Sequence, residues 1–134
     1  MMKKIEINQI ASFSKTITEH DVYAFAGITG DFNPVHIDKV AAEKSIFKER
    51  IAHGMLTASF ISTVIGMYLP GKGSIYLEQN VKFLKPVKIG STITAWVKIT
   101  NFDSEKDIYT LSTWVENDHA VKVIDGTAKI LYVK

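Results

Sequence analysis

The 134-residue sequence contains no cysteine, which excludes disulfides, thiolate metal ligands and cysteine nucleophiles. A chain of this size without disulfides fits a reducing compartment, so we expect a cytoplasmic protein. The net charge is only +2 and the basic residues are spread along the chain, which gives no footprint for nucleic acid. The longest apolar stretch, around residues 55–69, is interrupted by polar residues and is too short to span a bilayer. We therefore expect neither nucleic acid nor a membrane as a partner.

The sequence does contain enough apolar material for a core, because hydrophobic residues make up 46% of it. We expect a single domain over residues 1–134. Period-two alternation and β-branched residues predict strands at residues 11–17, 74–84, 91–102, 107–116 and 120–133. Asp125-Gly126 interrupts the last of these runs, and we expect a β-bulge there.

Helix signals lie in the first half of the chain. Thr18 followed by Asp21 resembles a capping box, and Gly30 is a suitable stop, which predicts a helix over residues 18–30. Asp38 can cap a second, short helix over residues 39–45.

A longer helix follows His53-Gly54 over residues 55–69. It is apolar on nearly every side, and such a helix is normally buried. Strands that follow helices in the chain indicate an α+β fold with an antiparallel sheet. Since one sheet cannot enclose a helix completely, we expect the sheet to curve around the helix and a second subunit to cover its far side.

Polar residues cluster unusually between Asp31 and His36. Proline disfavours the right-handed helical conformation of the residue before it, so Pro34 should hold Asn33 extended and stiffen the loop. On such a loop Asp31 and His36 can converge on one water molecule, with one group accepting a proton and the other donating one. The alternative is that Asp31 makes a local turn hydrogen bond and His36 lies on the surface.

His53-Gly54 stands at the head of the long helix, where backbone N–H groups have no internal partner and the helix dipole is positive. Glycine lets a ligand atom approach the backbone, so Gly54 could hold a carbonyl oxygen that gains negative charge. The alternative is a permissive cap at Gly54 with His53 packed nearby. Ser62, among apolar residues of this helix, is expected to be buried and bonded to a backbone carbonyl, a ligand contact being the alternative.

Two further groups of residues, lysines and histidines, are of types that can bind a phosphate or a metal. Lys82 and Lys85 recur with Lys88 around Pro86, where they form either a solvated face or a phosphate contact at a pocket mouth. The histidines lack the i, i+4 helical spacing of a metalloprotease-type site, and we expect no metal.

In combination these features resemble a known family. GDFNPVHID (residues 30–38) followed by RIAHGMLTASFIS (residues 50–62) resembles the hydratase 2 motif of the MaoC-like family, in particular the (R)-specific enoyl-CoA hydratases of bacteria. LPGKGSIYLEQNVKFLKPVKIGSTI (residues 69–93) is also similar, so the likeness covers nearly the whole chain. The resemblance implies a hot dog fold, a homodimer with active sites at the subunit interface, and reversible hydration of trans-2-enoyl-CoA, such as crotonyl-CoA, to (R)-3-hydroxyacyl-CoA. No cofactor is implied, because coenzyme A is part of the substrate.

The resemblance also implies residue roles. The catalytic pair falls on Asp31 and His36, the backbone N–H that holds the thioester carbonyl falls on Gly54, and a serine associated with the site falls on Ser62. Asn33 would support the loop or the water. Asp31 would take the proton of the water as oxygen adds to C3, and His36 would return a proton to C2.

The acyl tail is expected to lie beside the long helix. The candidates are apolar residues of that helix, most of which are also needed for the core: Met55, Leu56, Phe60 and Ile65. The rival functions are a 3-hydroxyacyl-ACP dehydratase, a hot dog acyl-CoA thioesterase and a non-catalytic acyl-CoA-binding module.

Overall fold

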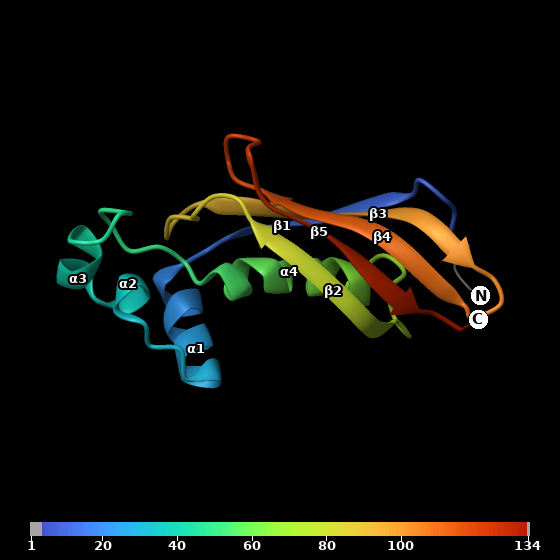
Figure 1. Cartoon of the computed structure of the whole chain (residues 1–134), viewed down its shortest axis with the longest axis horizontal. Coiled ribbons are helices and arrows are strands. Elements are labelled where there is room, and N and C mark those ends of the chain that lie inside the picture. Colours follow the sequence, from blue (N-terminus) through green and yellow to red (C-terminus); the bar gives the residue numbers. More distant parts are fainter. Residues whose placement is uncertain (1–3, 134) are drawn as a thin grey trace.

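The computed structural model describes residues 4–133, and it contains an antiparallel sheet, a long helix along one face of that sheet, and three shorter helices at one end (Figure 1). In chain order the elements are β1 (Ile10–Thr16), α1 (Glu19–Thr29), α2 (Pro34–Ile37), α3 (Lys39–Glu43), α4 (Gly54–Met67), β2 (Ile75–Phe83), β3 (Thr92–Asp103), β4 (Ile108–Glu116) and β5 (Lys122–Leu131). The strands pair in the order β1-β3-β4-β5-β2, so β1 and β2 are the edges of the sheet. The predicted α+β organisation is confirmed.

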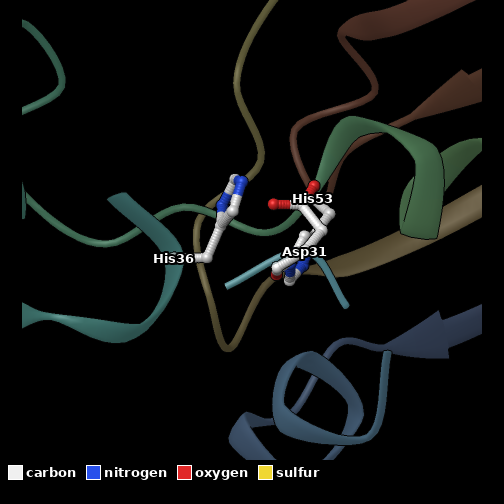
Figure 2. A group of neighbouring side chains, drawn as sticks. All are labelled: Asp31, His36 and His53. Atoms are coloured by element: carbon white, nitrogen blue, oxygen red, sulfur yellow. The ribbon is translucent and has the colours of Figure 1, made fainter. Parts of the chain in front are cut away.

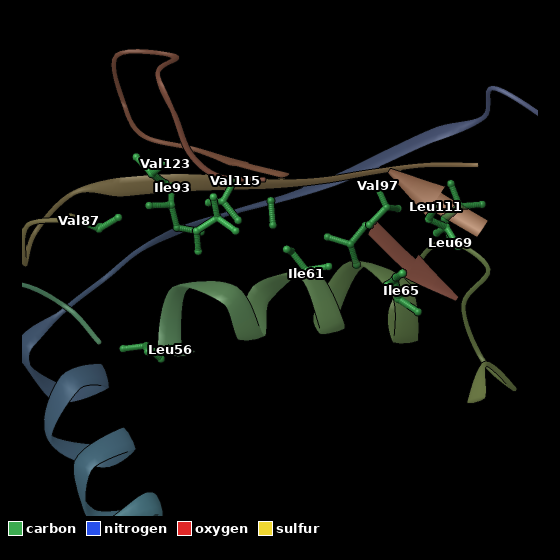
Figure 3. Packing of buried hydrophobic residues seen from close by; sticks show 14 of the residues in the cluster. Leu56, Ile61, Ile65, Leu69, Val87, Ile93, Val97, Leu111, Val115 and Val123 are labelled. Carbon is green, nitrogen blue, oxygen red and sulfur yellow. The ribbon is translucent and has the colours of Figure 1, made fainter. Parts of the chain in front are cut away.

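The core lies between α4 and the sheet (Figure 3). Every second residue of β3 from Ile93 to Ile99 is buried, as expected for a strand with one face on a core. From the helix, Ile61 and Val64 are fully buried and Ile65 is 1% exposed. These helix residues are three and four positions apart, which places them on one face, toward the sheet.

The opposite face of α4 is exposed in the single chain, as expected for a helix that one sheet cannot enclose. Met55 is 60% exposed and Met67 is 71% exposed. Ser62 is also exposed, and its predicted burial is wrong for the same reason. A single sheet covers one side of a helix, and no other segment of residues 4–133 covers the apolar residues on the other side.

The helix α1 begins and ends as its sequence predicts. The Thr18 side chain accepts a hydrogen bond from the Asp21 N–H at 3.2 Å, and the Asp21 carboxylate accepts one from the Thr18 N–H at 2.9 Å. Gly30 ends the helix in the left-handed conformation, at φ 82°. This cap fixes the point at which the chain leaves α1 for Asp31.

The predicted β-bulge at Asp125-Gly126 is wrong. The β2–β5 register continues through this position, with Val81 opposite Gly126, and the irregularity in this pair lies between Tyr76 and Glu78 instead. A Cβ at Gly126 would lie 1.9 Å from the backbone oxygen of Asn80. Glycine is therefore needed because the two strands approach closely.

Among residues 4–133, the structure contains no helix with the length and apolar character needed to cross a membrane.

Candidate active site

The loop that carries Asp31 is tied down by its own side chains. Asp31 Oδ1 accepts a hydrogen bond from the Asn33 N–H at 3.2 Å, and Asn33 Oδ1 accepts one from the Val35 N–H at 3.3 Å. Asn33 is extended, with ψ 125°, as the following proline requires. The chain then forms the one-turn helix α2 from Pro34, which the sequence analysis did not predict. Proline suits the first position of a helix because it lacks the N–H that would remain unpaired there.

His36 lies in α2 and is buried, with 8% exposure, so the alternative of a surface histidine is wrong. Its Nδ1 lies 2.8 Å from the carbonyl oxygen of Ile51. A carbonyl oxygen can only accept, so Nδ1 carries the proton. In the neutral ring Nε2 is therefore a free acceptor, with the tautomer set by a backbone group.

His53, immediately before α4, contacts both predicted catalytic residues. Its Nε2 donates to the backbone carbonyl oxygen of Asp31 at 2.9 Å. Its ring stacks on His36 with 3.9 Å between centroids and 29° between planes. His53 is 2% exposed, and the ring of Phe25 in α1 packs against it at 4.8 Å.

The structure brings Asp31, His36 and His53 into one group, supplied by the loop after α1, by α2 and by the start of α4 (Figure 2). One carboxylate oxygen and one ring nitrogen from each histidine lie within 4.8 Å of one another. Two hydrogen bonds of about 2.8 Å through one water span about 4.6 Å, so Asp31 and His36 can share a water. The spacing would also permit a metal ion, but Nδ1 of His36 and Nε2 of His53 carry the protons of the neutral rings and already donate to the backbone carbonyls of Ile51 and Asp31.

Gly54 is the first residue of α4 and lies next to His53 in the chain. A Cβ at Gly54 would meet the ring of Phe83 at 2.8 Å, so the absence of a side chain lets the ring pack on the helix start. Gly54 and Phe83 line a pocket of about 320 Å³. The other residues around this pocket are Phe47, Ile51, Ala52, Thr57, Leu84, Lys85, Pro86, Val87 and Ile124. The pocket thus adjoins the backbone N–H predicted to hold a carbonyl oxygen.

The predicted acyl-chain residues do not line one pocket in the single chain. Leu56 and Phe60 border a hollow of about 210 Å³ beside α1, whereas Ile65 faces the core and Met55 is exposed on the opposite side of α4. Ser62 is also outside the group of Figure 2, about 12 Å along the helix from Gly54 at 1.5 Å per residue.

Of the two predicted phosphate-contacting lysines, Lys85 borders the 320 Å³ pocket. Lys82 is exposed on the edge strand β2, outside that pocket. Two further groups at the site, the Phe83 ring and the Ile51 carbonyl, were not predicted from the sequence. Phe83 belongs to a strand in which alternation gave no reason to select it, and a backbone carbonyl leaves no sequence signal.

The chain is similar to several known proteins. The model of the MaoC like domain matches residues 3–121. A protein from Rhodospirillum rubrum named (R)-specific enoyl-CoA hydratase is 47% identical over 127 residues, which cover 95% of this chain and 88% of that protein. A Methylorubrum extorquens protein named 3-hydroxybutyryl-CoA dehydratase is 36% identical over 126 residues, covering 94% of this chain and 80% of its own length.

A solved structure is also similar. The (R)-hydratase from A. caviae involved in PHA biosynthesis superposes with a TM-score of 0.94 at 39% identity, covering 98% of this chain and 99% of that one. This likeness confirms the predicted hot dog fold. With a family model that matches most of its length, the chain belongs to the MaoC-like domain family.

Proposed function

We propose that the chain is a hydro-lyase, an (R)-specific enoyl-CoA hydratase that adds water reversibly to trans-2-enoyl-CoA of short chain length, such as crotonyl-CoA. The observation that carries the proposal is the convergence of the Asp31 carboxylate and the His36 ring within 4.8 Å beside the start of α4. The names of the similar proteins support the same reaction class.

The thioester carbonyl would accept a hydrogen bond from the Gly54 N–H, at the positive end of the α4 dipole. This interaction draws electron density from the conjugated double bond and makes C3 electrophilic. The 320 Å³ pocket beside Gly54 offers room for the thioester, with Lys85 at its border for the phosphates of coenzyme A.

The water would donate its two hydrogens to the Asp31 carboxylate and to Nε2 of His36. Because Nδ1 of His36 carries the proton shared with Ile51, the neutral ring can accept a proton at Nε2 but has none to give there. We therefore assign the proton released as oxygen adds to C3 to His36 instead of Asp31. The imidazolium, stabilised by the Asp31 carboxylate, then returns that proton to C2 on the same face. The sum is syn addition of one water, and no metal or redox cofactor takes part.

We further propose a cytoplasmic homodimer in which the exposed apolar surfaces of β2 and α4 meet those of a second copy. The edge strand β2 has one unpaired side and carries half-exposed Ile75, Leu77 and Phe83. The exposed methionines of α4 extend this apolar surface. Active sites at such an interface would explain why Ser62 and the acyl-chain candidates do not converge within one protomer.

The function is tested by following the loss of enoyl absorbance of crotonyl-CoA with the purified full-length protein and by determining the configuration of the 3-hydroxy product. The proposal requires hydration to the (R) product. Formation of the (S) product, or release of free thiol without hydration, would overturn it. A turnover much faster on crotonyl-ACP than on crotonyl-CoA would reassign the chain to carrier-protein dehydration.

A further inference from the structure

His53 has an unusual environment for a histidine in the interior of a protein. One ring nitrogen, Nε2, donates to the Asp31 carbonyl at 2.9 Å. The other, Nδ1, is buried and has no hydrogen-bond partner among the described residues. Buried polar atoms are normally paired, so an unpaired nitrogen in contact with the catalytic pair calls for an explanation.

The hydrogen bonds define the tautomer of the neutral ring. The Asp31 carbonyl can only accept, so the proton of the neutral ring sits on Nε2 and Nδ1 holds a lone pair. Among residues 4–133 no group forms a hydrogen bond with Nδ1, so the contacts of this ring are one donated hydrogen bond and its stacked face. These contacts suit a role in holding neighbouring groups in place.

The His53 ring has three neighbours, which are His36, Phe25 and Asp31. His36 stacks on one side at 3.9 Å, and a charge on both rings would be repulsive at this separation. Phe25 from α1 packs at 4.8 Å and carries no charge, and Asp31 is the one carboxylate in the group. Both rings have a nitrogen within 4.8 Å of the Asp31 carboxylate, but Nε2 of His53 is occupied by the Asp31 carbonyl, whereas His36 forms its backbone hydrogen bond through Nδ1 and keeps Nε2 as an acceptor.

We propose that His53 is a positioning residue for Asp31 and His36. Through its Nε2–H it fixes the backbone of Asp31, and through its stacked face it fixes the plane of the His36 ring. This inference rests on the proposed function for its role in turnover, but the tautomers that it assigns are properties of the free protein.

The first experiment is NMR spectroscopy of the full-length protein labelled with ¹⁵N in histidine, at a pH at which the histidine rings are neutral. We expect neutral His53 to carry its proton on Nε2 and neutral His36 to carry its proton on Nδ1. A neutral His53 with its proton on Nδ1, or a mixture of its two tautomers, would overturn the proposal. Because this readout needs no substrate, its failure is distinct from a failure of the proposed activity.

The second experiment compares two variants on crotonyl-CoA. His53→Phe keeps a ring against His36 but removes the donor to Asp31, whereas His53→Gln keeps a donor but removes the ring. A misplaced catalytic group can cost up to about 100-fold, so we expect kcat to fall about 10- to 100-fold in His53→Phe with KM nearly unchanged. His53→Gln should recover part of this loss.

His119→Gln is the matched control, since it removes an exposed histidine in the turn between β4 and β5. It should keep the kcat and the KM of the parent protein. Unchanged kcat in both His53 variants, or a change confined to KM, would contradict a positioning role.

Discussion

The ring of Phe83 lies against Gly54, in the space that a side chain at residue 54 would enter. A Cβ there would be 2.8 Å from Cε1 of Phe83, which is closer than real Cβ contacts. The start of α4 and the end of β2 thus pack closely because residue 54 has no side chain, and both residues line the 320 Å³ pocket.

Gly54→Ala should therefore raise KM for crotonyl-CoA while the protein stays folded. Alanine favours the helix, but its methyl group would push the half-exposed Phe83 ring into the pocket. The backbone N–H remains, so adding Phe83→Leu should restore part of the affinity. Steady-state kinetics with a thermal melt check this, and an unchanged KM in Gly54→Ala would show that the pocket does not receive the thioester.

Asp31→Asn and His36→Gln should each lower turnover of crotonyl-CoA by about 10²–10⁴-fold, the usual effect of losing a positioned acid or base. Both should retain a cooperative thermal transition. The His119→Gln protein serves again as a control for loss of a histidine. Near-normal turnover in either variant would show that the Asp31–His36 group is not the catalytic pair.

Gly126→Ala should destabilise the protein by about 2–4 kcal/mol, because its Cβ would lie 1.9 Å from the backbone oxygen of Asn80 and would force β2 away from β5. Gly27→Ala is the matched control. Gly27 lies inside α1 with no atom within 4 Å of its Cβ position, so alanine should stabilise by about 0.5–1 kcal/mol. Urea unfolding measures both, and equal effects would contradict the close approach of the strands.

Asp21 should make the free energy of unfolding depend on pH in the acidic range. Partial burial raises the pKa of Asp21, but hydrogen bonds from Lys15 and Thr18 outweigh it and hold the pKa below its usual value of 3.8. A lowered pKa in the folded state means a stabilisation that is present above pH 3.8 and is lost as the pH falls through the lowered pKa. Asp21→Asn should cost about 0.5–1 kcal/mol at neutral pH, with the difference vanishing below this window. A pH-independent difference between the two unfolding curves would refute the assignment.

Ile75→Lys with Leu77→Lys should convert the proposed dimer to a monomer, because both residues are about half exposed on the edge strand β2. Ile10→Lys places one lysine on β1, the other edge of the sheet, and should leave the dimer intact. Light scattering after gel filtration measures the mass. A monomeric parent protein, or a dimer that only Ile10→Lys breaks, would rule out β2 as the contact.

Signals carried by neighbouring residues predicted local structure well. Thr18 and Asp21 form the expected capping box, and Pro34 holds Asn33 extended as expected. The one-turn helix after Asn33 was missed because four residues give no periodicity to detect. The error on Ser62 has a different cause. Apolar composition indicates that a helix will be covered, but it does not tell whether the same chain covers it.

The site could be predicted in its residue types but not in its hydrogen bonds. Asp31, His36 and His53 stood out as polar residues between apolar segments, and the structure gathers them. The hydrogen-bond partners of the two histidines are backbone carbonyls, those of Ile51 and Asp31. Such partners cannot be predicted from residue type, because every residue has a backbone carbonyl. The close contact of Phe83 with Gly54 arises from chain segments far apart in the sequence, so only the folded structure reveals it.

The carbonyl of residue 51 has one more consequence. Every amino acid supplies that oxygen, so the tautomer of His36 is independent of which side chain stands at residue 51, while the Ile51 side chain itself borders the 320 Å³ pocket. Substitutions at this position would reshape the cavity and keep the hydrogen bond to His36. In the proposed mechanism, residue 51 would thus allow the substrate range to be altered without changing the groups that transfer protons.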